Sequence, residues 1–225
     1  MKQAFLSVLL ITVPLLAEDS AKQAKHMNEA AGVLTEIMNA KDQSIPQELL
    51  DNAHCIGIVP NLKRAGFVVG AKFGKGFLSC RTENGNWSAP SMVRIEGGNI
   101  GLQIGAGETD VVFVVMNQKG QEKLNDDKFT IGADISAMAG PVGRSAEAKT
   151  DAAMRAEIVS YSRSRGLFAG VTLDGATLRP DNDDNADIYG RQIRQRDILR
   201  GTVPPPAAAK TLMNTLNQYA ARKSG

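Results

Sequence analysis

The stretch AGFVVGAKFGKGF, residues 65–77, decides the fold expected for this chain of 225 residues. Large apolar residues and glycines alternate along it, and successive residues of an extended strand point to opposite faces of a sheet. We therefore predict one apolar face and one of nearly bare backbone, which favours strong curvature or a close approach by another segment. The alternation is set by Phe67, Val69, Ala71, Phe73 and Phe77 on one face and by Gly66, Gly70, Gly74 and Gly76 on the other.

Strand-like patterns continue on both sides of this stretch. Before it, an apolar run extends from Cys55 to Pro60, and after it Asn84-Gly85 is a hairpin turn signal. The segment 110–116 is apolar throughout, which predicts a strand buried on both faces. Further extended segments are expected over 92–104, 131–140, 157–162 and 167–178.

Helical patterns lie toward the two ends of the chain. Residues 18–50 repeat apolar positions at three- and four-residue spacing, with a break at 44–46. A polar cluster predicts the cap of a helix over 181–199. The Pro-rich spacer 204–206 then precedes a C-terminal amphipathic helix over 207–223.

Residues 1–17 have the layout of a secretory signal peptide. A basic start at Lys2 is followed by an apolar run, and Ala17 precedes an acidic pair. We expect an exported chain, periplasmic or secreted, in which 18–225 form a single domain with a core over about 30–203. The alternative is an uncleaved anchor, for which the apolar run is short.

Composition and motifs argue against several classes of function. The formal net charge is +2, which does not suggest a nucleic-acid-binding protein. The chain has only two histidines, and no arrangement of nucleophile, base and orienting group is evident. We therefore expect a protein that is not an enzyme and that has no cofactor, no metal and no small-molecule substrate.

Two cysteines, Cys55 and Cys80, leave two alternatives open. In an oxidising compartment they could form a disulfide. They could equally be two buried thiols, because free cysteine packs as a small hydrophobic residue.

An acidic cluster after residue 180 has two interpretations. Its spacing matches positions 1, 3, 5 and 7 of a calcium loop, but Ala186 and Gln192 stand where such a loop needs Gly and Glu. The alternative, which we favour, is a helix N-cap with carboxylates at the positive end of the helix dipole. The candidate calcium ligands are Asp181, Asp183, Asn185 and Asp187.

The segment SYSRSRGLFAG, residues 160–170, resembles the signature of the SYLF domain family. Other blocks similar to that family follow the expected order, and the resemblance covers about 30–216. Several ordered blocks are more specific than a single motif. These blocks are residues 55–60, 63–67, 85–90, 101–105 and 140–144.

The resemblance implies a lipid-binding function, since eukaryotic members bind phosphoinositides and a yeast member binds and bundles actin. Together with the patterns above, it leads us to expect an α+β fold, a curved, largely antiparallel, half-barrel-like sheet with N- and C-terminal helices. The leading hypothesis is a non-enzymatic exported domain that binds anionic phospholipid or phosphoinositide at the cell envelope. The alternative is an envelope scaffold without lipid affinity, whose C-terminal helix docks to a protein partner.

Basic residues in the family-like blocks and on the first helix are the expected lipid contacts. The first helix carries less positive charge than the Lys-rich helix of eukaryotic relatives, so we expect weak, salt-sensitive attraction. The alternative for each residue is an ordinary surface charge, paired with Asp or Glu. The expected contacts are Lys22, Lys25, Lys63, Arg64, Lys72, Lys75, Arg163 and Arg165.

Overall fold

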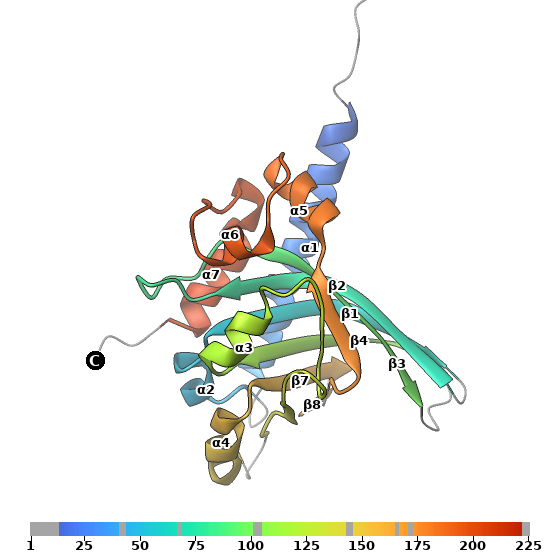
Figure 1. The fold of residues 1–225 in the computed structure, drawn as a ribbon, viewed down its shortest axis with the longest axis vertical. Helices are drawn as coiled ribbons and strands as arrows, with labels where there is room; N and C mark the ends of the chain where they lie inside the picture. Colours follow the sequence, from blue (N-terminus) through green and yellow to red (C-terminus); the bar gives the residue numbers. More distant parts are fainter. Residues whose placement is uncertain are drawn as a thin grey trace, which may run out of the picture.

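Four long strands run through the centre of the molecule: β1 (Cys55–Gly66), β2 (Val69–Cys80), β3 (Ser91–Ile100) and β4 (Gly105–Val115). They belong to one nine-stranded sheet of order β5-β9-β3-β2-β1-β4-β7-β6, with β8 paired to β7. Only the β6–β7 pair is parallel among the recorded strand pairs. The sheet curls into a half-barrel with helices packed against it (Figure 1).

This computed structural model confirms the expected α+β class. It describes residues 14–40, 44–66, 69–100, 105–142, 146–164, 167–170 and 173–221. The shorter strands are β5 (Phe129–Thr130), β6 (Ala137–Ala139), β7 (Ile158–Ser164), β8 (Leu167–Gly170) and β9 (Ala176–Pro180). The helices are α1 (Pro14–Asn39), α2 (Gln47–Asp51), α3 (Gln118–Lys123), α4 (Ala146–Arg155), α5 (Asn182–Tyr189), α6 (Gln195–Leu199), the 3-10 helix η2 (Ala207–Ala209) and α7 (Lys210–Tyr219).

Two apolar layers, one on each face of the sheet, hold the helices in place. Val112 and Val114 of β4 belong to the layer that includes α1, α2 and α7. Val111, Phe113 and Val115 belong to the opposite layer, to which α6 contributes. All five side chains are fully buried, which confirms the predicted strand with two covered faces.

The glycine face of β2 lies where β1 bulges toward it. The register of the two strands shifts between Ile58 and Lys63. A Cβ added at Gly76 would lie 2.2 Å from the carbonyl oxygen of Ile58, and one added at Gly74 would lie 2.7 Å from a methyl of Leu62. The predicted close approach is confirmed, and the approaching segment is the neighbouring strand.

Beyond the bulge, the four central strands project past the helices (Figure 1). We call this projection the arm and define it by its described residues, 62–66, 69–74, 96–100 and 105–109. Phe73 on the arm is 46% exposed, whereas Phe77 on the same face of β2 is buried in the layer beneath α1. The predicted apolar face of β2 therefore ends between these two residues.

Glycines with positive φ interrupt three elements that we expected to be continuous. Gly190, with φ 65°, ends α5, so the predicted helix over 181–199 divides into α5 and α6. Gly132 (φ 89°) and Gly175 (φ 72°) lie in turns that shorten the strands expected over 131–140 and 167–178. Positive φ is cheap only for glycine, so these positions favour turns.

Helix α4 was not predicted. Its sequence, AEAKTDAAMR, is rich in good helix formers but has few large apolar residues. Hydrophobic periodicity, the main signal for a helix, is therefore weak in this segment. Its Ala153 is nevertheless buried in the layer that includes α1.

The start of the chain leaves the signal-peptide hypothesis as a prediction. Helix α1 begins at Pro14, and residues 1–13 lie outside the described residues. Across the described helices, none is long and apolar enough to cross a membrane.

Candidate functional site

Three of the eight expected lipid contacts, Lys63, Arg64 and Lys72, lie on the arm. In the register of β1 and β2, Arg64 lies opposite Lys72, and Lys63 lies opposite Phe73. Because side chains alternate along a strand, the first pair points to one face of the arm and the second pair to the other. Lys63 is exposed, and Arg64 and Lys72 are half-buried. The arm therefore carries cationic side chains on both faces.

The Arg64–Lys72 pair sets two positive charges side by side. Like charges directly opposite each other destabilise a sheet. Burial and then the charge of Arg64 lower the pKa of Lys72, and Asp174 partly opposes this shift. Lys72 Nζ donates a hydrogen bond to the carbonyl oxygen of Asp174, at 3.2 Å. A bound anion would relieve the repulsion, so this pair is suited to a phosphate or carboxylate.

The charges around Phe73 are mixed. Glu96 of β3 lies opposite Phe73, and Glu108 of β4 lies opposite Lys63. The Glu96 carboxylate contacts Arg179 at 2.8 Å. An exposed aromatic ring with charges of both signs around it is more typical of a protein contact than of an anion site.

Lys75 lies in an ion-pair network beside α5 rather than on a free surface. Its Nζ is 2.9 Å from Asp181 Oδ2 and 2.7 Å from Asp184 Oδ2, and Arg94 Nη2 is 2.7 Å from Asp181 Oδ1. Burial alone would raise the pKa of Asp181, but the bonds from Arg94 and Lys75 hold this pKa below its usual value. Two carboxylates already neutralise Lys75, which makes it a poor lipid contact.

The same network decides between the two interpretations of the acidic cluster, a calcium loop and a helix cap. Asp181 is the N-cap of α5, and its side chain accepts a hydrogen bond from the backbone N–H of Asp184. The side-chain oxygen of Asn185 accepts from the backbone N–H of Met92 at 2.7 Å, while Asp183 and Asp187 are exposed. Within the described residues, no group of three or more His, Cys, Asp or Glu could hold a metal ion. The cluster is thus a helix cap, as in the alternative we favoured.

Arg163 links α1 to the sheet through two ion pairs. Its guanidinium pairs with Glu36 of α1 and, at 3.3 Å, with Asp110 of β4. The same Asp110 carboxylate accepts from the backbone N–H of Asn61 at 2.9 Å. Arg163 therefore fits the paired-charge alternative, and the predicted contact at Arg165 lies outside the described residues.

Lys22 and Lys25 lie on α1, a different element from the arm. Both are exposed. Lys25 Nζ is 3.9 Å from Glu29 Oε1, one helical turn along the chain. Such an exposed ion pair is weak, so it would not prevent Lys25 from contacting lipid. Both lysines therefore stay candidate lipid contacts.

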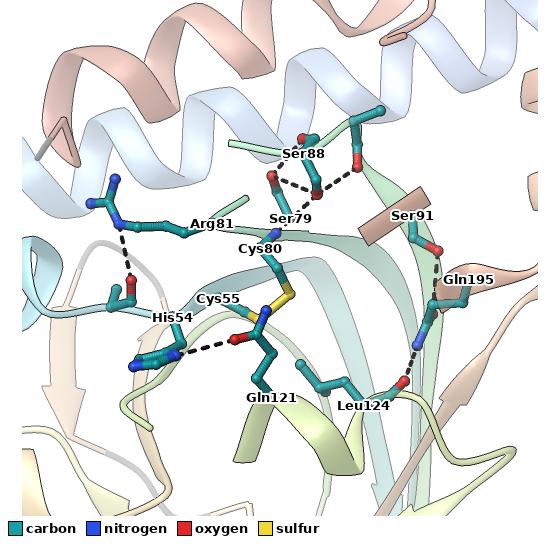
Figure 2. Close-up of a disulfide and its surroundings, with 12 residues drawn as sticks. His54, Cys55, Ser79, Cys80, Arg81, Ser88, Ser91, Gln121, Leu124 and Gln195 are labelled. Carbon is teal, nitrogen blue, oxygen red and sulfur yellow. Dashed lines mark hydrogen bonds between the residues drawn. A yellow bond between two sulfur atoms is a disulfide. The ribbon is translucent and has the colours of Figure 1, made fainter. Parts of the chain in front are cut away.

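A disulfide between Cys55 and Cys80 joins the start of β1 to the end of β2 (Figure 2). The two residues are register partners, and both are fully buried. Beside them, the His54 ring shares a hydrogen bond of 3.1 Å with Gln121 of α3. Of the two alternatives for the cysteines, the structure has the disulfide.

The C-terminal helix is anchored to the sheet at its end. Trp87 Nε1 and Arg81 Nη2 both donate to the carbonyl oxygen of Ala220, at 3.1 and 2.7 Å, and the Arg81 guanidinium lies 4.4 Å over the Trp87 ring. Leu212 and Leu216 of α7 are buried in the core. The chain's own core therefore covers the apolar face of this helix, and docking of the helix to a protein partner stays a prediction that concerns its exposed side.

The sequence did not predict two features of the structure, the exposure of Phe73 and the role of Arg81. The alternation in β2 placed Phe73 on the apolar face, whereas the structure leaves its ring exposed. The only sequence signal that the strand is exposed at this point is the charge of the neighbouring Lys72. The role of Arg81 was also missed, because its partners are backbone carbonyls of Leu50, Ala53 and Ala220. Such partners leave no side-chain pattern in a sequence.

Comparisons with known proteins agree with the resemblance stated above. Residues 96–219 match the family model "Ysc84", described as "Las17-binding protein actin regulator". SH3 domain-containing YSC84-like protein 1 of Rattus norvegicus is 33% identical over 205 residues, 91% of this chain and 59% of that protein. LAS seventeen-binding protein 3 of Saccharomyces cerevisiae is 36% identical over 182 residues, 80% of this chain and 39% of that protein. The chain thus spans 39–59% of the length of these two relatives.

Proposed function

Because the chain belongs to the Ysc84 family of Las17-binding actin regulators, whose domain is also called SYLF, we propose that it is a membrane-binding module acting at the cell envelope. The family is one of non-enzymatic regulatory proteins, in agreement with the expectation that this chain is not an enzyme. In this proposal the arm contacts anionic lipid. The observation that carries the proposal is the opposed Arg64–Lys72 pair on the projecting arm.

The arrangement of charges supports an anionic surface as the partner. Arg64 and Lys72 are held together at a cost, and lipid phosphates would remove that cost. Each Lys or Arg near an anionic membrane contributes about 1 kcal/mol. Arg64 and Lys72 share one face of the arm and would together gain about 2 kcal/mol, which gives weak attraction that salt screens. The exposed Lys22 and Lys25 on α1 would add to it only if both elements reach the surface together.

The disulfide supports action outside the reducing cytoplasm. Disulfides persist in oxidising compartments such as the periplasm and the extracellular space. The Cys55–Cys80 bridge therefore agrees with the signal-peptide layout of residues 1–17. An exported chain would meet envelope lipids, and the partners in the printed names of its relatives need not be its own.

Vesicle co-sedimentation of the full protein tests the proposal. We expect it to pellet with vesicles that contain phosphatidylglycerol, less so as salt rises, and not with pure phosphatidylcholine. The double variant Arg64→Gln/Lys72→Gln loses two charges at about 1 kcal/mol each, so we expect about a thirtyfold loss of affinity.

The matched control neutralises two exposed lysines away from the arm, in the variant Lys128→Gln/Lys210→Gln. It should pellet with at least a tenth of the wild-type affinity. Equal loss in both variants would mean that only total charge matters. Unchanged pelleting of the arm variant would reject the arm as the lipid contact.

A second candidate function, binding of a protein partner, is favoured by Phe73. Its ring is 46% exposed, and Lys63, Glu96 and Glu108 lie around it in the register of the sheet. Exposed aromatic anchors with a charged rim are typical of protein interfaces. Since the family is described as actin regulators, co-sedimentation with actin filaments is the direct test. Phe73→Ala should abolish pelleting, and wild-type protein that stays in the supernatant would reject actin as the partner.

A further inference from the structure

An open groove lies at the end of the central strands that is opposite the arm. Its walls are the turn 81–89 between β2 and β3, helix α3 and the segment 199–205 that follows α6. Its volume is about 1120 Å³, comparable with the upper end of ordinary ligand pockets. Nothing in the proposed membrane contact uses this groove.

Carboxamide side chains dominate the polar lining of the groove. A carboxamide presents a donor and an acceptor side by side and carries no charge. The formal charges in the lining cancel, because Arg81 and Arg200 are balanced by Glu83 and Glu122. The six carboxamides are Asn52, Asn84, Asn86, Gln118, Gln121 and Asn125.

Several of the charged or ionisable groups in the lining are already engaged. Arg81 directs its guanidinium to backbone carbonyls, among them those of Ala53 at 3.0 Å and Gly85 at 3.1 Å. His54 faces Gln121, as Figure 2 shows. Glu122 accepts a hydrogen bond from Gln118 at 2.9 Å. Arg200 of the lining is exposed, but a single open guanidinium in a lining that also holds Glu83 and Glu122 does not make a strong anion site.

Three carboxamides face solvent with their hydrogen-bonding capacity unused. Asn84, Asn86 and Asn125 are exposed, and no side-chain hydrogen bond is recorded for them within the described part of the chain. Pro204 and Pro205 add two exposed rings to the opposite wall. The groove thus combines neutral donor–acceptor groups with small apolar faces.

From this chemistry we propose that the groove binds a neutral oligosaccharide. Sugar hydroxyls both donate and accept hydrogen bonds, which matches carboxamides, and the C–H faces of the rings suit the prolines. A peptide ligand is disfavoured because the apolar lining residues Ala53, Leu199 and Val203 are buried and form no open side-chain pockets. The inference is independent of the proposed membrane function.

The single tryptophan of the chain, Trp87, lines the groove but is only 6% exposed, so its fluorescence is followed together with the heat of binding. The full protein is titrated with chitotetraose, cellotetraose and maltotetraose while tryptophan fluorescence is followed. We expect a saturable change with at least one of the three. The variant Asn86→Ala/Asn125→Ala should weaken that binding about thirtyfold, since it loses two hydrogen bonds that contribute about 1 kcal/mol each.

The control is Asn28→Ala, which removes an exposed carboxamide on α1, away from the groove. It should bind as the wild type does, and both variants should keep the wild-type melting temperature. No response to any of the three sugars overturns the inference. So does a response to inorganic phosphate or to tetra-alanine alone, which would assign the groove to an anion or to a peptide. The Arg64→Gln/Lys72→Gln variant should keep sugar binding, which separates this test from that of the membrane function.

Discussion

The two ends of the same four strands differ in almost every property that matters for function. At the disulfide end, Cys55 pairs with Cys80 and Val115, and both faces of the sheet are covered. At the arm end, Gly66 pairs with Gly70 and Gly105, and charged side chains replace the apolar ones. The comparison teaches that backbone pairing runs the full length of the strands, while the apolar cover ends at the base of the arm, where Leu62 of β1 is still fully buried. We therefore expect the disulfide end to supply most of the stability of the fold, and the arm to supply the membrane contact.

Substitution of two phenylalanines on one face of β2 should give the largest difference in unfolding free energy between the two ends. Phe77→Ala removes a fully buried ring and should lower the free energy of unfolding by about 3–5 kcal/mol. Phe73→Ala removes an exposed ring and should change it by no more than about 0.5 kcal/mol. Urea unfolding of both variants measures the difference. Similar losses in the two would mean that the arm is as well packed as the rest of the sheet.

The disulfide gives the next largest effect. The bridged cysteines are 25 residues apart in sequence, so the chain-entropy argument predicts a stabilisation of about 3 kcal/mol. The variant Cys55→Ala/Cys80→Ala should lose about that amount in urea unfolding, and adding a reductant to it should change nothing further. Vesicle binding by the variant should persist under conditions where it is folded. A variant as stable as the wild type would show that the bridge adds nothing to this end of the sheet.

Lowering the pH should cause a smaller loss of stability, through protonation of Glu157. Hydrogen bonds from Lys119 and Ser136 lower the pKa of Glu157 to about 2 from its ordinary 4.5. A lowered folded-state pKa stabilises the protein above about pH 4.5, and this contribution is lost as the pH falls toward 2. Because Lys119 is largely exposed, screening reduces the contribution to about 1–3 kcal/mol.

The variant Glu157→Gln isolates this contribution. Its unfolding free energy should be lower than that of the wild type at pH 6, and the gap should close as the pH falls through 4 toward 2. Chemical unfolding at a series of pH values measures the gap. A gap that stays constant with pH would show that the ionised carboxylate is not what stabilises this region.

The parts of the fold that the sequence predicted are those with a local signal. Apolar alternation revealed the central strands, and the polar cluster at Asp181 revealed the cap of α5. Helix α4 escaped because its helical signal lies in propensity rather than periodicity. The turns at Gly132 and Gly175 were not predicted, because a single glycine inside an apolar stretch does not indicate whether the chain turns at that residue.

The candidate site was predictable only in part, for a related reason. Residue type identified Lys63, Arg64 and Lys72, and the structure places all three on the arm, with Arg64 and Lys72 on one face and Lys63 on the other. The same reasoning selected Lys75 and Arg163, whose carboxylate partners are distant in sequence and so could not be foreseen. Whether a cation is free or paired depends on tertiary contacts, which a list of basic residues does not contain.

Hydrogen–deuterium exchange with and without phosphatidylglycerol vesicles tests the central claim most directly, because it reports both ends of the strands in one experiment. We predict that vesicles slow exchange over the arm residues 62–66 and 69–74 and leave the disulfide end, residues 75–80, unchanged. Protection confined to the part of α1 around Lys22 and Lys25, with the arm unchanged, would contradict the account and assign the membrane contact to that helix.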